Sequence, residues 1–246
     1  MEIRTFGSGG RQSECARILS ERLSSRRGRL ILLPIPTARD KKYITGTSYA
    51  VEDILPMLDK GSFVVGYNIP SAITDRARQV GALVYDAGED EDFLCDNAEL
   101  TARGAVGYLL THGGRDLAEL NIGVIGYGRI GIRLIRLLLL FGANLTVYTG
   151  RREVAMELCE MGISACVIGD SPDLSALDIL INTAPARQID EADLPEKTEI
   201  IDLASGRVFE PSGRLTKLAS IPDHTYPLTA GRMYAEAVLR AMEGGL

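Results

Sequence analysis

Three glycines in the segment GYGRIG, Gly126, Gly128 and Gly131, have the spacing of a turn that cradles a dinucleotide pyrophosphate. In such a turn the first glycine permits the tight bend, the second lets the backbone approach the phosphates, and the third lets a helix pack closely on a strand. Arg129 and Ile130 open that helix, whose first N–H groups and positive dipole end favour an anion. The spacing predicts a dinucleotide site at these five residues, and the alternative is a glycine-rich turn that binds nothing.

The residues around this turn alternate between strand and helix patterns. Residues 122–126 form an apolar run typical of a buried strand, residues 129–141 have apolar side chains at helical spacing, and residues 143–148 return to a strand pattern. Strands that alternate with helices at this rhythm predict an α/β fold with a doubly wound parallel (Rossmann) sheet. The further elements expected are a helix over 153–161, strands over 178–183 and 199–204, and a closing helix over 230–242.

The tip after the second strand lacks the acidic residue that usually accepts hydrogen bonds from the adenosine ribose of NAD. A hydroxyl and guanidinium groups can instead hold a 2′-phosphate through charge-assisted hydrogen bonds. Thr149, Arg151 and Arg152 therefore favour NADP, with NAD as the second choice. The alternative is that both arginines are solvated residues of the next helix, paired with Glu153 or Glu157.

The first hundred residues repeat the alternation of strands and helices more loosely. We expect a second, smaller α/β domain over 1–96 at the N-terminus. A connector helix is expected over 97–114, because two glycines at its end supply a stop signal. The Rossmann domain is then expected over 115–246, with the closing helix as part of it.

Composition and charge narrow the class of partner. The net charge is −6, and no lysine or arginine block stands free of acidic neighbours, which gives no support for a nucleic-acid or membrane-surface role. The four cysteines form no CxxC pair and have no histidine at ligand spacing, so we expect neither a metal site nor a secreted disulfide framework. The first residues have no apolar signal core, and the longest apolar run is too short to span a bilayer. We therefore expect a cytoplasmic protein with small-molecule or protein partners.

Three further segments make the sequence specific enough to compare with one protein family. INTAP (181–185), DLAS (202–205) and PLTAG (227–231) follow the glycine turn and Arg151 in order. With these segments the chain resembles the A subunit of dipicolinate synthase from spore-forming bacteria, an NADP-binding Rossmann family related to D-2-hydroxyacid dehydrogenases. GSGGRQ (7–12) and the segment 33–46 look like that family's N-terminal glycine turn and substrate-side loop.

The resemblance implies NADP-dependent oxidation of a dihydrodipicolinate-type ring to pyridine-2,6-dicarboxylate, with the N-terminal domain on the substrate side. Aromatisation makes this oxidation downhill, so the protein mainly has to orient the ring and hold two carboxylates. Cationic side chains of one loop and the N–H groups of the last helix are the substrate-binding candidates, and an ordinary charged loop is the alternative. These candidates are Arg39, Lys41, Lys42, Thr229, Ala230 and Gly231.

INTAP and DLAS each follow a predicted strand, so both lie at the carboxyl ends of a parallel sheet, where ligands bind. Asn182 and Asp202 either serve the ligand or only tie down these turns. The residues expected to line the nicotinamide half of the cofactor site are Thr183, Ala184, Pro185, Ala204 and Ser205.

Only two histidines occur, and His224 beside Asp223 is the candidate for acid–base catalysis. His112 is interpreted as a residue that ends a helix. Two alternative functions stay open: a D-2-hydroxyacid dehydrogenase-like enzyme, and a non-catalytic NADP(H)-binding subunit. The second is favoured by the short first domain and by Arg103, where the family has an acid. The resemblance also implies a partner, the B subunit of dipicolinate synthase, and we expect a homo-oligomer.

Overall fold

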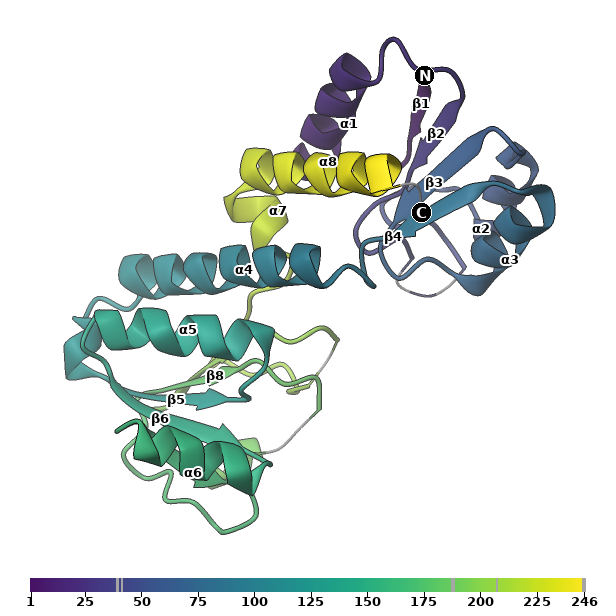
Figure 1. Cartoon of the computed structure of the whole chain (residues 1–246). Coiled ribbons are helices and arrows are strands. Elements are labelled where there is room, and N and C mark those ends of the chain that lie inside the picture. The colour runs from purple at the N-terminus through teal and green to yellow at the C-terminus, as the bar shows by residue number, and fades with distance from the viewer. Residues whose placement is uncertain (39, 41, 187–188, 207, 245–246) are drawn as a thin grey trace. The chain divides into compact units, whose positions relative to one another are not determined.

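The computed structural model describes residues 1–38, 40, 42–186, 189–206 and 208–244. The chain forms two compact units. The N-terminal unit comprises Met1–Asn97 and Pro222–Leu246, and the C-terminal unit comprises Ala98–Ile221 (Figure 1). Both units are α/β, which confirms the predicted fold class.

The N-terminal unit contains a four-stranded parallel sheet in the order β1-β2-β3-β4. Alternate residues of β3 point to opposite faces: Phe63 and Val65 face α1 and α8, whereas Val64 faces α2 and α3. The strands are β1 (Glu2–Thr5), β2 (Arg29–Leu32), β3 (Ser62–Gly66) and β4 (Leu83–Asp86). The helices are α1 (Gly10–Arg22), α2 (Val51–Ile54), η1 (Leu55–Met57), α3 (Ser71–Val80), α8 (Pro227–Gly244) and the first part of α4 (Glu91–His112).

The closing helix α8 packs against α1 in the N-terminal unit, which differs from its expected place in the Rossmann domain. Tyr234 and Val238 are fully buried in the same core cluster as the α1 side chains. Two glycines let the helices cross closely. A Cβ on Gly231 would lie 2.7 Å from the Arg11 carbonyl oxygen, and one on Gly10 would lie 2.5 Å from Pro227 Cβ. The apolar face of α8 therefore completes the first core.

The C-terminal unit contains a six-stranded parallel sheet in the order β10-β9-β8-β5-β6-β7. From β5 the chain steps outward to β6 and β7, then returns to the other side of β5 and continues through β8, β9 and β10. This is the predicted doubly wound order, and its switch point lies between β5 and β8. The strands are β5 (Asn121–Ile125), β6 (Asn144–Thr149), β7 (Ser164–Val167), β8 (Ile179–Asn182), β9 (Glu199–Asp202) and β10 (Leu215–Lys217).

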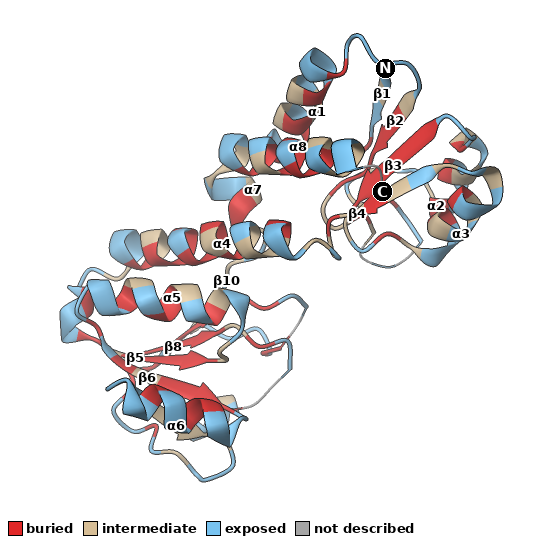
Figure 2. Ribbon diagram, viewed as in Figure 1, coloured by how far each residue is buried: buried red, intermediate tan, exposed pale blue. Residues whose placement is uncertain are grey.

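The two faces of this sheet are covered in different ways. Leu134 of α5 and Leu158 of α6 pack on one face together with Val106 from the second part of α4. On the other face, buried side chains such as Leu174 and Phe209 come from segments whose described residues form no α-helix. Figure 2 shows the strands buried between these layers. The helices and 3-10 turns are η2 (Leu117–Glu119), α5 (Arg129–Leu140), α6 (Arg152–Glu160), η3 (Glu191–Asp193) and α7 (Ile221–Thr225), which straddles the unit boundary.

Helix α4 and two edge strands of the C-terminal sheet differ from the sequence prediction. Helix α4 begins at Glu91, six residues before the predicted connector, and the unit boundary falls inside it. Strands β7 and β10 were not predicted, because they are short, lie at the sheet edges and are only partly buried. Among the described residues, no helix combines the length and apolar character needed to cross a membrane.

Asp178 joins the amino ends of two strands and makes stability depend on pH. Its carboxylate accepts a hydrogen bond from Asn121 N at 3.0 Å and lies 3.4 Å from both Arg115 Nη1 and Lys197 Nζ. The Asn121 N–H group, with help from Lys197 and Arg115, lowers the pKa of Asp178. A carboxyl whose pKa is lower in the folded state stabilises the fold above its unfolded pKa, and this contribution is lost as the pH falls through the folded pKa.

We therefore expect Asp178→Asn to lower the melting temperature at pH 7. We also expect the variant to lose less stability than the wild type when the pH is lowered from 7 to 3. Thermal melts over that range measure both effects. Glu196→Gln, at an exposed acid of the same unit, is the control. An acid-induced loss in Asp178→Asn as large as in the wild type would contradict the assignment.

Candidate functional site

The three glycines of the turn after β5 have three different environments. Gly126 has a φ of 97°, and its N–H donates to Tyr148 O at 2.9 Å, which joins the ends of β5 and β6. A Cβ on Gly131 would lie 2.3 Å from Gly126 O, so this position needs a glycine for close packing. Gly128, the N-cap residue of α5, has no heavy atom within 4 Å of an added Cβ. The backbone of this turn therefore faces open space at the start of a helix, as a bound phosphate requires.

The arginines after β6 are placed differently from each other. Arg151 Nη2 donates to Tyr127 O at 2.9 Å, so its guanidinium group lies against the glycine turn. Arg151 N donates to the buried Thr149 Oγ1 at 3.2 Å. Arg152 Nη2 instead contacts both carboxylate oxygens of Asp170, at 3.1 and 2.8 Å. Arg151 is the arginine beside the glycine turn, whereas Arg152 already has an acidic partner.

Asp170 was missed in the sequence, where Glu153 and Glu157 were considered as partners of the arginines. It follows β7, a strand that was not predicted, and it is 18 residues from Arg152. Its place at the end of the neighbouring strand brings it to the same edge of the sheet, because β6 and β7 are parallel. Asp170 could have been found from the sequence only if the segment before it had been recognised as a strand that pairs with β6.

Thr183 links the turn after β8 to the glycine turn across the switch point. Its Oγ1 donates to Ile125 O at 2.8 Å, and its N–H donates to the same oxygen at 3.0 Å. A Cβ on Gly126 would lie 2.7 Å from Thr183 Oγ1 and 3.6 Å from Ala184 Cβ. The structure thus brings Thr183 and Ala184 to the glycine turn, while Pro185 is exposed farther along this turn.

Polar side chains form a row across the carboxyl ends of three strands. Asn182, Asp202 and Lys217 are the last residues of β8, β9 and β10, and they are paired in register. Asp202 Oδ1 accepts from Asn182 Nδ2 at 2.8 Å, and Asp202 Oδ2 accepts from Lys217 Nζ at 2.6 Å. Asn182 Oδ1 accepts the N–H of Ala184 and Asp202 Oδ1 accepts that of Ala204, both at 3.1 Å. These contacts agree with the interpretation that Asn182 and Asp202 tie down their turns.

The turn after β9, residues 203–206, is held by this row. Ala204 is buried and Ser205 is exposed. Lys217, which was not a candidate in the sequence, donates to Ala204 O at 2.5 Å and to Gly206 O at 2.7 Å. It was missed because β10 was not recognised as a strand.

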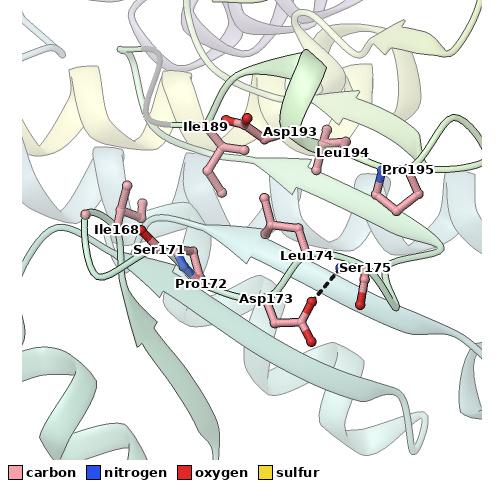
Figure 3. Close-up of a pocket in the computed structure, with 11 residues that line it drawn as sticks. Ile168, Ser171, Pro172, Asp173, Leu174, Ser175, Ile189, Asp193, Leu194 and Pro195 are labelled. Atoms are coloured by element: carbon pink, nitrogen blue, oxygen red, sulfur yellow. Dashed lines mark hydrogen bonds between the residues drawn. The ribbon is translucent and has the colours of Figure 1, made fainter.

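A cavity of about 650 Å³ lies on the face of the C-terminal sheet that the loops cover (Figure 3). Its apolar lining includes Leu174 and Leu194, and its polar lining includes Asp173, whose carboxylate accepts from Ser175 N at 2.9 Å. That hydrogen bond lowers the pKa of Asp173. Ile168 lines the cavity and is joined to the end of β6 by a 2.9 Å hydrogen bond to Thr149 O. One lining residue of the cavity, Ile168, is thus hydrogen-bonded to the strand end that Arg151 follows.

The substrate-side candidates lie in the N-terminal unit. Arg39 and Lys41 are outside the described residues, and Lys42 is exposed. The segment 229–231 lies in the first turns of α8, where Thr229 is exposed and Ala230 and Gly231 are buried. The contact of Gly231 with α1 gives this glycine a packing role, so Thr229 is the member of the segment that solvent can reach.

The histidines differ in their surroundings. His112 is the last residue of α4, as predicted, and its ring stacks on Tyr108 with centroids 4.2 Å apart. His224 is an exposed residue of α7. Asp223 Oδ1, considered as the group that orients His224, lies 3.1 Å from Nε of Arg11, whose side chain is only 3% exposed. Burial lowers the pKa of the Arg11 guanidinium, and the charge of Asp223 opposes that shift. The Asp223 carboxylate therefore forms an ion pair with the Arg11 guanidinium.

Two α/β units, each built on a parallel sheet, with a glycine turn at the switch point of the second sheet, define a Rossmann-type fold. D-lactate dehydrogenase from Escherichia coli has this fold, with a TM-score of 0.64, 12% identity, and coverage of 100% of this chain and 97% of that chain. The structure of the dipicolinate synthase A subunit from Bacillus halodurans is more similar, with a TM-score of 0.78, 22% identity, and coverage of 98% and 97%.

The sequence agrees with this likeness. The A subunit of dipicolinate synthase from Bacillus subtilis is 24% identical over 229 residues, which cover 86% of this chain and 77% of that protein. No protein-family model matches the chain. The resemblance predicted from the ordered motifs is therefore confirmed: the chain is similar in sequence and in fold to the A subunit of dipicolinate synthase.

Proposed function

We propose that the chain is an oxidoreductase that binds a nicotinamide dinucleotide, NADP in preference to NAD, on its C-terminal unit. The observation that carries the proposal is the glycine turn, in which Gly126 makes the bend, Gly131 permits packing, and Gly128 leaves open the space in front of the helix. The fit of these residues to a pyrophosphate supports a cofactor role over a purely structural one.

The remaining groups at the carboxyl ends of the strands can be assigned to the rest of the cofactor. Thr149 and Arg151 would hold the 2′-phosphate. The cavity lined by Ile168, Leu174 and Leu194 would offer apolar surface for the adenine ring. Thr183, Ala184, Ala204 and Ser205 would line the nicotinamide half, which accepts a hydride when the cofactor is bound.

For the substrate we propose a dihydrodipicolinate-type ring, on the basis of the similarity to the A subunit of dipicolinate synthase. The ring would lose a hydride to NADP⁺ and a proton to solvent, and would become aromatic pyridine-2,6-dicarboxylate. Lys42 and Thr229 of the N-terminal unit are exposed donors that could bind its carboxylates, and Arg39 and Lys41 stay candidates from the sequence. His224 stays an acid–base candidate, and Asp223 beside it is paired with Arg11.

The decisive experiment supplies an enzymatically generated dihydrodipicolinate precursor and NADP⁺ to the protein, with and without a candidate B subunit. Ultraviolet absorbance of the aromatic dicarboxylate and NADPH absorbance should rise together, because one hydride is transferred for each ring. No product under either condition, with NADPH binding intact, would favour the non-catalytic binding protein. Turnover of 2-hydroxy acids instead would favour a D-2-hydroxyacid dehydrogenase-like enzyme.

A further inference from the structure

We propose that Lys217 is a positioning residue that fixes the turn 203–206 on the nicotinamide side of the site. The inference rests on the proposed function, because that turn matters only if the cofactor binds at the carboxyl ends of the strands. The positioning role is assigned to Lys217 because of the contacts that its ammonium group makes.

The ammonium group of Lys217 has three protons and three protein acceptors. These are Asp202 Oδ2 at 2.6 Å, Ala204 O at 2.5 Å and Gly206 O at 2.7 Å. Since an ammonium group has three donors and no acceptor, this set uses all of them. Lys217 is therefore not free to bind a substrate carboxylate, and its charge acts on the turn.

The acceptors of Lys217 lie along the turn itself. Ala204 and Gly206 belong to it, and Asp202 immediately precedes it and holds its first part through Ala204 N. Asp202 also accepts from Asn182, whose side chain holds the turn after β8. The two turns that would border the nicotinamide are thus joined through one carboxylate, and Lys217 secures the outer turn.

Charge compensation is the second role of Lys217. The Asp202 side chain is only 2% exposed, whereas that of Lys217 is 33% exposed. Removal of the cation would leave a buried carboxylate with amide donors alone, which destabilises a fold. A variant that keeps the positive charge on a cationic group of different shape can separate the effect of charge on stability from the effect of hydrogen-bond geometry on the turn.

Lys217→Met and Lys217→Arg make that separation. Methionine removes the charge, so it should lower both the melting temperature and the order of the turn. Arginine keeps the charge beside Asp202 and should recover most of the stability. Its planar guanidinium presents donors in a fixed fork, which does not match the three acceptors around one nitrogen. Lys197→Met is the matched control, since Lys197 is also paired with an aspartate but lies before β9, at the opposite end of the strand.

The readout is binding of two probes by the full chain. The probe 2′,5′-ADP contains only the adenosine half of NADP, whereas NADPH adds the nicotinamide, whose fluorescence reports its surroundings. In Lys217→Met and Lys217→Arg we expect the affinity for 2′,5′-ADP to stay within about twofold of the wild type. The affinity for NADPH should fall about tenfold, or about 1.4 kcal/mol. Lys197→Met should leave both affinities unchanged.

Two results would overturn the inference: an equal loss for both probes in Lys217→Arg, or no loss for either probe in Lys217→Met. If the wild type binds neither probe, the proposed cofactor site itself is wrong. Where turnover is observed, the variants should lower kcat without raising KM for the dicarboxylate, because Lys217 holds a turn rather than the substrate. A rise in KM alone would instead identify Lys217 as a substrate ligand.

Discussion

Gly128→Asp is expected to fold like the wild type and to lose binding of NADPH and NADH together. Gly128 is the N-cap residue of α5, its φ of −102° is ordinary for any residue, and the space around an added Cβ is empty. Aspartate is a favoured N-cap residue, so the change should not weaken the helix. The new carboxylate would occupy the space that the pyrophosphate needs and would repel its charge. We expect a loss of at least about a hundredfold in affinity, or about 2.7 kcal/mol.

Fluorescence titration with NADPH and a thermal melt measure the two parts of this prediction. Gly213→Asp is the matched control, since an added Cβ there also meets no atom within 4 Å and the residue lies just before β10, away from the strand ends that carry the site. Gly131→Ala should behave in the opposite way to Gly128→Asp, because its Cβ would meet the backbone oxygen of Gly126 and cost stability. Undiminished NADPH binding by a folded Gly128→Asp variant would contradict the proposed site.

Arg151→Asp is expected to remove a preference of at least about tenfold for NADPH over NADH, or about 1.4 kcal/mol. Arg151 lies against the glycine turn through Tyr127 O, where its charge can reach a 2′-phosphate. An aspartate would repel that phosphate and could accept hydrogen bonds from the ribose hydroxyls of NAD. The preference should therefore vanish or reverse.

The neighbouring arginine provides the control for this prediction. Arg152 already contacts both oxygens of Asp170, so we expect Arg152→Gln to change the ratio of the two affinities by less than about threefold. The dissociation constants of NADPH and NADH for the wild type, Arg151→Asp and Arg152→Gln test both statements. Equal affinities in the wild type would exclude the 2′-phosphate interpretation of these arginines.

The central part of the fold could be predicted because its physical signals are local. The strand before Gly126, the helix after it and the second strand have strong apolar patterns, and Gly126 and Gly131 each occupy a position where a side chain would clash. The short edge strands β7 and β10 lack such a pattern. Their ends carry Asp170 and Lys217, so two polar contacts of the site were missed along with the strands.

The place of α8 could not be predicted for a different reason. Its pattern indicates a helix with one apolar face, but pattern alone does not say which core that face completes. The choice depends on contacts far apart in the sequence, such as those between α1 and Gly231 and the fit of Tyr234 into the first core. Sequence order suggested the Rossmann domain, and long-range packing favoured the N-terminal unit.

The return of α8 to α1 has a consequence for the order in which the chain can fold during synthesis. The C-terminal unit is one continuous segment, so it can become compact as soon as residue 221 has left the ribosome. The N-terminal unit is translated first, yet Leu19 and the other α1 core side chains have no α8 to cover them until residues 227–244 have been made. We therefore expect the half that is made first to finish folding last.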